Sequence, residues 1–262
     1  MSVARCLTIA GSDSGGGAGI QADLKAFAGA GCFGMSAIVA LTAQNTVGVT
    51  AVQEVAPEFV RAQLDAVFSD IGVDAAKTGM LFSRPIIEAV ADFLSEQPIP
   101  LVVDPVMVSA SGAQLLQDDA VEALVTRLFP LATVITPNLD EAQALGEVDT
   151  EDRGVLAEQL HALGAPAVLV TGGHGERAVD HLFTSGKHVE IPVERHDVRA
   201  THGAGCTHSA TLTALLAQGK SLEEAARGAA LAASAAVANG LDELGEGEGP
   251  VDVLGLTNRE AR

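Results

Sequence analysis

Short apolar runs alternate with longer segments of helical periodicity along most of the chain. Continuous apolar runs of the kind that parallel sheets bury on both faces predict strands at Cys6–Ala10, Met35–Thr42, Ala75–Thr78, Leu101–Asp104, Val134–Thr136 and Ala167–Thr171. Val49–Val55 is also predicted to be extended. Residues 178–193 alternate loosely around Gly186, which predicts a hairpin or a pair of edge strands.

Helical periodicity fills the segments between these runs. The predicted helices are Ala18–Ala30, Pro57–Ser69, Pro85–Leu94, Ala120–Leu128, Asn138–Leu145, Glu151–Leu163, Gly203–Gln218 and Ser221–Asn239. Pro57 suits the first position of its helix, where a backbone N–H has no acceptor. The last helix opens with a capping box, Ser221-Leu-Glu-Glu224, and stops at Gly240.

Repeated strand–helix units predict an α/β protein of three layers, with a mainly parallel sheet between two layers of helices. No linker or low-complexity tract divides the chain, so we expect one domain over residues 1–262. The GEGEG run at 245–249 suggests only a flexible loop near the C-terminus. In such sheets ligands bind beyond the carboxyl ends of the strands, which directs attention to the residues that follow each strand.

Composition narrows the range of partners. Hydrophobic residues make up 48% of the 262 residues, enough for a sizeable core. The formal net charge of −19 argues against a nucleic-acid partner, which needs a Lys/Arg footprint, and against an anionic membrane surface. An anionic small substrate is compatible with this charge where a cation or a helix N-terminus offsets the repulsion.

The N-terminal sequence MSVARCLTIAGSD has no charged lead before a long apolar core, so we expect no secretory signal. No stretch approaches ~20 uninterrupted apolar residues, so we expect no membrane span. The three cysteines, Cys6, Cys32 and Cys206, are far apart and odd in number. They predict neither a disulfide framework nor a structural zinc site, and they fit the reducing cytoplasm best.

The stretch AGSDSGGGAGIQADL at 10–24 joins a strand to a helix through glycines that let a ligand approach the backbone. It is not a dinucleotide-binding fingerprint, and the chain has no P-loop. Asp23 lies on or beside the inward face that Ile20 and Phe27 define, so its carboxylate needs a partner. A ligand-binding role and a purely structural capping or ion-paired role are both open on spacing alone.

Two further strand ends carry acidic residues. Asp104 ends an apolar run and Pro105 redirects the chain, a position at which carboxylates hold Mg²⁺ through water. In TPNLDEA at 136–142, Asn138 and Glu141 stand three residues apart on the first helical turn and so face the same side. A loop-capping Asp104, and a Glu141 that only complements the helix dipole, are the structural alternatives.

The stretch THGAGCTHSA at 201–210 is a glycine-rich turn that runs into a helix. The backbone N–H groups of Ala204, Gly205 and Cys206 would converge at the helix start and form an anion hole. The same field, with help from His202, would lower the pKa of the Cys206 thiol and favour the thiolate. The alternative is that Cys206 is a small buried apolar residue, which is our interpretation of Cys6 and Cys32.

Taken together, these stretches resemble the ribokinase-like superfamily and, within it, the bacterial hydroxymethylpyrimidine/phosphomethylpyrimidine kinases of thiamine biosynthesis. The resemblance covers nearly the whole chain, and the number, order and spacing of its motifs make it specific. The motifs are AGSDSGGGAGIQADLKAF (10–27), TAQNT (42–46), KTGML (77–81), VVDPVMV (102–108), TPNLDEA (136–142), TGGH (171–174) and HGAGCTHSA (202–210).

The resemblance implies a role for each matching residue. Asp23 and Gln44 would hydrogen-bond the aminopyrimidine and its hydroxymethyl arm, and a Gln amide can both donate to and accept from such an edge. The other residues implied around the pyrimidine are Gly11, Ala18, Met80 and Val106. The implied Mg²⁺ ligands, acting through water, are Asp104 and Glu141. The residues implied beside the nucleotide are Asn138, Thr171 and Gly173. The residues implied to form the anion hole are Gly203, Ala204, Gly205 and Cys206.

The sequence departs from the family pattern at three places. Thr171 stands where the family has a lysine, which removes a cation expected near the phosphates; His174 or Lys77 are the candidates to replace it. Ala113 follows Ser111-Gly112 where the pattern has SGD. His208 replaces an expected apolar residue, and we expect it to face the surface.

The implied reaction is in-line attack of a substrate hydroxyl on the γ-phosphorus of ATP, for which a weak base suffices because positioning and charge stabilisation dominate. We expect a kinase that phosphorylates 4-amino-5-hydroxymethyl-2-methylpyrimidine and then its monophosphate, with ATP and Mg²⁺, as a homodimer. Whether a monovalent cation assists is open. The alternatives are a pyridoxal kinase of the same superfamily and a pyrimidine-binding relative without turnover. A dehydrogenase is set aside because the dinucleotide fingerprint is missing.

Overall fold

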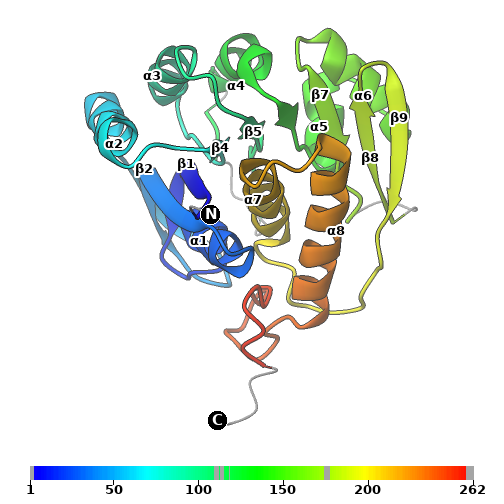
Figure 1. The fold of residues 1–262 in the computed structure, drawn as a ribbon. Helices are drawn as coiled ribbons and strands as arrows, with labels where there is room; N and C mark the ends of the chain where they lie inside the picture. Colours follow the sequence, from blue (N-terminus) through cyan, green and yellow to red (C-terminus); the bar gives the residue numbers. More distant parts are fainter. Residues whose placement is uncertain (1–2, 109–111, 113–114, 118, 174–177, 258–262) are drawn as a thin grey trace.

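A computed structural model describes residues 3–108, 112, 115–117, 119–173 and 178–257, and Figure 1 shows their course. The described strands form a single nine-stranded sheet. They are β1 (Arg5–Asp13), β2 (Phe33–Gln44), β3 (Val49–Glu54), β4 (Ala75–Thr78), β5 (Leu101–Val103), β6 (Val134–Ile135), β7 (Ala167–Val170), β8 (Val179–Thr184) and β9 (Lys187–Pro192).

The strand order is β3-β2-β1-β4-β5-β6-β7-β8-β9. The six strands from β2 to β7 run parallel, while β3 pairs antiparallel with β2 at one edge. At the other edge β8 and β9 form an antiparallel hairpin, and Gly186 takes a φ of 73° in its turn. The predicted three-layer α/β fold with a mainly parallel sheet is confirmed, and so is the hairpin within 178–193.

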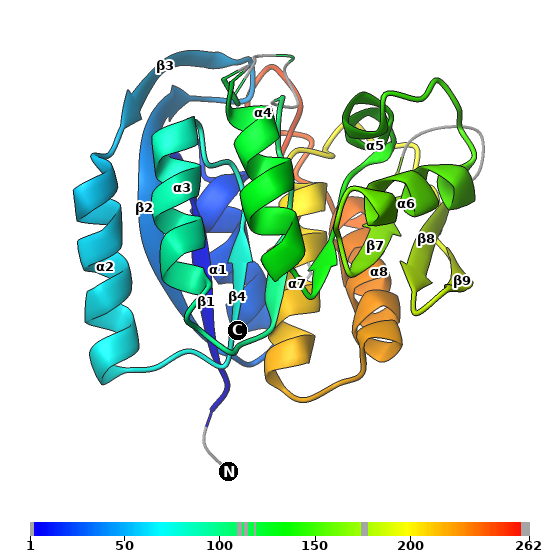
Figure 2. The same ribbon diagram turned by 90° about the horizontal axis from the view of Figure 1, so that it is seen from above.

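Helices cover both faces of this sheet (Figure 2). One layer holds α1, α7 and α8, and the other holds α2, α3, α4, α5 and α6. Their bounds are α1 (Gly19–Gly29), α2 (Pro57–Asp70), α3 (Arg84–Leu94), α4 (Ala120–Ala123), α5 (Leu139–Gly146), α6 (Arg153–Ala162), α7 (Ala204–Ala217) and α8 (Leu222–Ala238). In the described part of the chain no helix has the length and apolar character needed to cross a bilayer.

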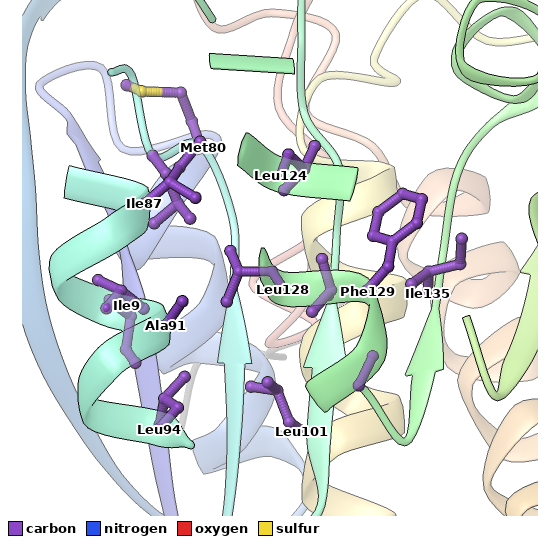
Figure 3. Packing of buried hydrophobic residues seen from close by; sticks show 14 of the residues in the cluster. Ile9, Met80, Ile87, Ala91, Leu94, Leu101, Leu124, Leu128, Phe129 and Ile135 are labelled. Carbon is purple, nitrogen blue, oxygen red and sulfur yellow. The ribbon is translucent and has the colours of Figure 1, made fainter. Parts of the chain in front are cut away.

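The core lies on both faces of the sheet because successive strand residues point to opposite sides. Val103 and Ile135 join the large cluster under α2 to α6, whereas their neighbours Val102 and Val134 join the cluster under α7 and α8. Figure 3 shows side chains of the large cluster, with Phe129 beside Ile135. Burial on both faces explains why these strands appear in the sequence as continuous apolar runs.

The predicted helix over 120–128 is only partly regular. α4 spans Ala120–Ala123 and continues as a π-helical turn over Leu124–Leu128, before a 3-10 turn over Phe129–Leu131 that contains Pro130. A proline after the helical pattern removes a backbone donor, so a regular helix cannot continue through it. The capping box of α8 is formed as predicted between Ser221 and Glu224.

The 245–249 segment is held by contacts that its composition does not reveal. The N–H of Gly247 donates to the hydroxyl of Thr46 at 3.3 Å, and the carbonyl of Gly249 accepts from the N–H of His202 at 3.1 Å. Glu248 accepts a hydrogen bond from the hydroxyl of Thr201. The expectation of a merely flexible loop therefore missed its role in fixing the turn before α7.

Candidate active site

A cavity of about 750 Å³ opens beyond the carboxyl ends of the parallel strands. It lies where ligands bind in open α/β sheets, because the loops that leave neighbouring strands diverge there. Every residue that the sequence placed in the site lines this cavity: Gly11, Ala18, Asp23, Gln44, Met80, Asp104, Val106, Asn138, Glu141, Thr171, Gly173, Gly203, Ala204, Gly205 and Cys206. Their individual roles stay predictions.

Gln44 and Met80 line the part of the cavity near β1 and β2. The side-chain oxygen of Gln44 accepts a hydrogen bond from the Thr42 hydroxyl at 3.0 Å, which fixes the orientation of the amide. Met80 is buried, and its carbonyl accepts from the N–H of Gly11 at 3.1 Å. An amide with a fixed orientation beside an apolar side chain suits a flat ring with polar edges.

Lys77 links the two predicted site aspartates. Its ammonium lies 2.9 Å from Asp23 Oδ1 and 3.5 Å from Asp104 Oδ2, and the hydroxyl of Thr8 donates to Asp23 Oδ2 at 2.6 Å. Burial would lower the pKa of Lys77, but the two carboxylates raise it above its ordinary value, so the ammonium stays charged. The expected partner of the inward-facing Asp23 is therefore Lys77.

Because Lys77 is fully buried and bound to both aspartates, it is already neutralised. The other candidate for the missing cation, His174, lies outside the described residues, as do Ser111 and Ala113.

Asp104 and Glu141 approach each other across the cavity wall. The hydroxyl of Ser209 donates to Asp104 at 2.7 Å, and Glu141 accepts from the N–H of Asn138 at 3.0 Å. Burial and then the negative charge of Asp104 raise the pKa of Glu141 to about 8. A divalent cation between the two carboxylates would relieve this repulsion.

These residues fit Mg²⁺, which takes one or two carboxylates and keeps several of its own waters. No group of three acidic, His or Cys side chains gathers as a metal site among the residues that the structure describes. Two carboxylates are consistent with a cation held together with substrate phosphates, as the sequence predicted for Asp104 and Glu141.

The anion hole is predicted at the start of α7, and its role stays a prediction. Gly203 takes a φ of 85°, and a Cβ there would overlap the carbonyl oxygen of Gly17. The N–H of Ala204 already donates to the carbonyl of Thr201 at 3.1 Å, so its predicted place in the hole is wrong. Gly205 and Cys206 are first-turn residues, whose N–H groups have no acceptor within the helix. A Cβ on Gly205 would meet no heavy atom within 4 Å, so a ligand can approach there.

The predicted activation of Cys206 is wrong. Burial raises the pKa of its thiol to about 12, and the nearby charge of Lys77 only partly offsets this. His202 does not assist, because its Nε2 lies 3.0 Å from Asp13 Oδ2. Cys206 therefore carries its proton at neutral pH. Cys6 and Cys32 are buried, as expected.

Asp13 is an organising residue that the sequence analysis did not single out. Its carboxylate accepts from the N–H groups of Gly15, Gly17 and Ala18 at 2.7, 3.0 and 2.8 Å, in addition to His202. Burial would raise the pKa of Asp13, but these hydrogen bonds lower it below its ordinary value. An aspartate before a run of glycines is typical of such a turn and was the available signal.

His208 does not face the surface, so that expectation is wrong. It is 5% exposed, and its Nε2 lies 2.9 Å from Asp180 Oδ2. The other oxygen of Asp180 accepts from the N–H of Gly172 at 2.6 Å. The position is buried because α7 lies between α1 and α8 against the sheet, so residues on most of its circumference are covered (Figure 1).

Residues 13–252 match the family model described as phosphomethylpyrimidine kinase. The chain belongs to this family. A hydroxymethylpyrimidine/phosphomethylpyrimidine kinase of Rhizobium meliloti is 52% identical over 253 residues, covering 94% of this chain and 95% of the relative. A thiamine biosynthesis bifunctional protein of Geobacter sulfurreducens is 48% identical over 252 residues, covering 94% of this chain and 51% of that protein.

Among solved structures, an ADP complex of Bacillus subtilis pyridoxal kinase superposes with a TM-score of 0.89 at 40% identity, covering 98% of this chain and all of the other. A phosphomethylpyrimidine kinase family member and a pyridoxal kinase thus share one backbone. The substrate distinction within this fold depends on the side chains of the cavity rather than on its architecture.

Proposed function

We propose that this chain transfers the γ-phosphoryl group of ATP to 4-amino-5-hydroxymethyl-2-methylpyrimidine, and then to its monophosphate, in thiamine biosynthesis. The observation that carries the proposal is the set of residues along one cavity, from Gln44 at the end of β2 to Cys206 at the start of α7. Relatives that bear this activity in their names are up to 52% identical over nearly the whole chain, which supports it.

The pyrimidine binds in this proposal between Met80 and Ala18, with the amide of Gln44 on its polar edge. Thr42 holds that amide at 3.0 Å, so the ring is oriented before reaction. The hydroxymethyl group then points toward the start of α7.

The transferring phosphoryl group meets the N–H groups of Gly205 and Cys206. They are fixed at the helix N-terminus before the substrate binds, so charge that develops in the transition state is stabilised without reorganisation. The Cys206 thiol is protonated at rest, so it cannot accept the hydroxyl proton; its S–H donates to a phosphate oxygen, and the hydroxyl proton passes to a phosphate oxygen or to water as the new P–O bond forms.

Asp104 and Glu141 would hold Mg²⁺, which neutralises phosphate charge when it is bound. Ser209 positions Asp104, and Asn138 positions Glu141, through the hydrogen bonds described above. Thr171 and Gly173 lie at the end of β7, where they would contact the nucleotide. The similarity to a kinase solved with ADP supports the use of ATP.

Pyridoxal phosphorylation is the second candidate, favoured by the 0.89 TM-score to a pyridoxal kinase. One assay separates the two activities. Purified protein with Mg-ATP is given the hydroxymethylpyrimidine, its monophosphate or pyridoxal, and ADP release is followed with each. We expect turnover with both pyrimidines. Rapid phosphorylation of pyridoxal with neither pyrimidine converted would show that the substrate assignment is wrong, and no ADP release at all would indicate a binding protein without turnover.

We also propose a homodimer in the cytoplasm. The support for dimerisation is the family resemblance together with exposed apolar side chains near the β2–β3 edge, where Leu41 is 47% and Val47 is 62% exposed. Sedimentation equilibrium of the protein and of Leu41→Glu measures the mass directly. A monomeric mass for the unaltered protein would contradict this proposal.

A further inference from the structure

His208 is a buried polar side chain in the cavity wall with one nitrogen unsatisfied. Its Nε2 is paired with Asp180, whereas its Nδ1 is buried without a hydrogen-bond partner among the described residues. A buried nitrogen without a partner costs free energy, so it calls for an explanation. His208 also lines the cavity, so a ligand bound there is a candidate partner for this nitrogen.

The surroundings of His208 place that ligand near the nucleotide end. His208 follows Cys206 by two residues on α7, and Asp180 connects it to the N–H of Gly172 in the loop that leaves β7. Thr171 stands immediately before Gly172. The imidazole therefore lies between the helix start that would stabilise the phosphoryl group and the strand end that would contact the nucleotide.

Because the cavity lining is mostly acidic, a bound phosphate chain needs hydrogen-bond donors there. In the described part, its acidic lining residues are Asp13, Asp23, Asp104, Asp140, Glu141, Asp180, Glu194 and Glu248, whereas its lysine and arginine residues are Lys77 and Arg195. Lys77 is bound to Asp23 and Asp104. A nucleoside triphosphate adds several negative charges to this surface, so hydrogen-bond donors and cations have to offset them.

We propose that His208 binds the phosphate chain of the nucleoside triphosphate through Nδ1, with Asp180 as the residue that orients the imidazole. The proposal rests on the proposed kinase function. Phosphate oxygens accept hydrogen bonds, so Nδ1 carries the proton in the complex while Nε2–H donates to Asp180.

Nucleotide binding tests this directly. Calorimetry with ADP and with adenosine, at one fixed Mg²⁺ concentration, compares the unaltered protein with His208→Leu. Loss of a charge-assisted hydrogen bond predicts about tenfold or more weaker binding of ADP, with adenosine changed less than twofold. His188→Leu is the matched control, because His188 pairs with Glu158 on the surface, outside the cavity. Equal affinities for ADP in folded His208→Leu and the unaltered protein would overturn the proposal.

A second variant guards against misfolding, because His208→Leu leaves a buried oxygen of Asp180 unpaired. The amide of His208→Gln can still donate to Asp180 but carries no positive charge, so it should weaken ADP binding and not adenosine binding. A rescue experiment distinguishes a charge role from a purely structural role. The double variant His208→Leu with Thr171→Lys supplies a cation from the neighbouring strand end in place of the lost imidazole. It should restore most of the lost ADP affinity; no restoration in a folded double variant counts against a charge role for His208.

These outcomes are separable from those of the proposed function. Normal turnover of the pyrimidines with an unchanged KM for ATP in the His208 variants would overturn only the present proposal. ADP binding that depends on His208, in a protein that converts neither pyrimidine, would overturn only the substrate assignment.

Discussion

Cys206 and Glu141 both hold a proton more readily in the folded protein than in an unfolded chain, because burial penalises their charged forms. For Cys206 this means a thiol rather than a thiolate. A protonated thiol cannot take the hydroxyl proton, and beside two first-turn N–H groups it acts as a weak hydrogen-bond donor. That suffices for phosphoryl transfer, in which positioning and charge stabilisation supply most of the rate.

The contribution of the thiol is measurable by substitution. We expect Cys206→Ser to lower turnover by about tenfold or more, since a hydroxyl is a much weaker acid than a thiol, with little loss of pyrimidine binding. Steady-state kcat and equilibrium binding of the pyrimidine give the two quantities. An unchanged kcat would mean that the backbone N–H groups act alone and that the thiol is incidental.

Glu141 makes stability depend on pH. Its pKa is about 8 when folded and about 4.5 when unfolded, so between these values the folded state binds more protons. The free energy of unfolding therefore falls as pH rises from about 5 to about 8 and levels off above this window. Urea denaturation at several pH values in Mg²⁺-free buffer should show this decline, and Glu141→Gln should flatten it while lowering activity. Identical slopes for both proteins would contradict the assigned shift.

At the scale of elements, two glycine-rich segments meet at the cavity. The loop between β1 and α1 is held by Asp13, and α7 begins directly against it, with Gly203 at the carbonyl of Gly17. His202 joins the two segments through its bond to Asp13. Their close approach is what places the first turn of α7 at the cavity.

Gly203→Ala tests this junction. A Cβ at Gly203 would overlap the Gly17 carbonyl, and the positive φ is strained for alanine, so we expect a loss of at least ~1–3 kcal/mol in the free energy of unfolding. Gly205→Ala is the comparison: its Cβ has open space, and alanine favours helix, so this variant should be at least as stable as the unaltered protein. Its activity should nevertheless fall, because the methyl group enters the proposed anion hole. Equal melting temperatures for the two variants would contradict this account.

At the scale of the molecule, Lys77 connects separate parts of the fold. It lies in β4 at the middle of the sheet and pairs with Asp23 from α1 and with Asp104 after β5. The three groups are buried, so each charge is tolerated only because the others are present. The active site and the centre of the sheet therefore share one ion network.

Lys77→Met should therefore destabilise the whole protein. Two buried carboxylates would lose their counter-charge, and breaking such a network costs about 3–5 kcal/mol. Urea denaturation measures the loss, and Lys187→Met, at an exposed position in β9, should stay within about 0.5 kcal/mol of the unaltered protein. A small effect of Lys77→Met would show that the aspartates become protonated or hydrated at little cost.

Local patterns in the sequence determined the fold class and the position of the cavity. Apolar runs buried on both faces, such as Leu101–Val103, give parallel strands, and the polar residues that follow them must meet at one edge of the sheet. The helix ends were equally local: Asn138 and Glu141 form a capping box because they stand three residues apart. The hydrophobic periodicity over 120–128 did not predict the departure from a regular helix before Pro130.

Pairings between distant residues were decided only by the tertiary structure. Asp23 meets Lys77, and His208 meets Asp180, across separations that no spacing rule covers. Burial is likewise a property of the assembled layers: it keeps Cys206 protonated, where the helix-start pattern alone predicted a thiolate. The sequence determined which groups reach the cavity, because strand ends and helix starts are local, whereas their charge states depend on solvent exclusion and on neighbours that only folding brings near.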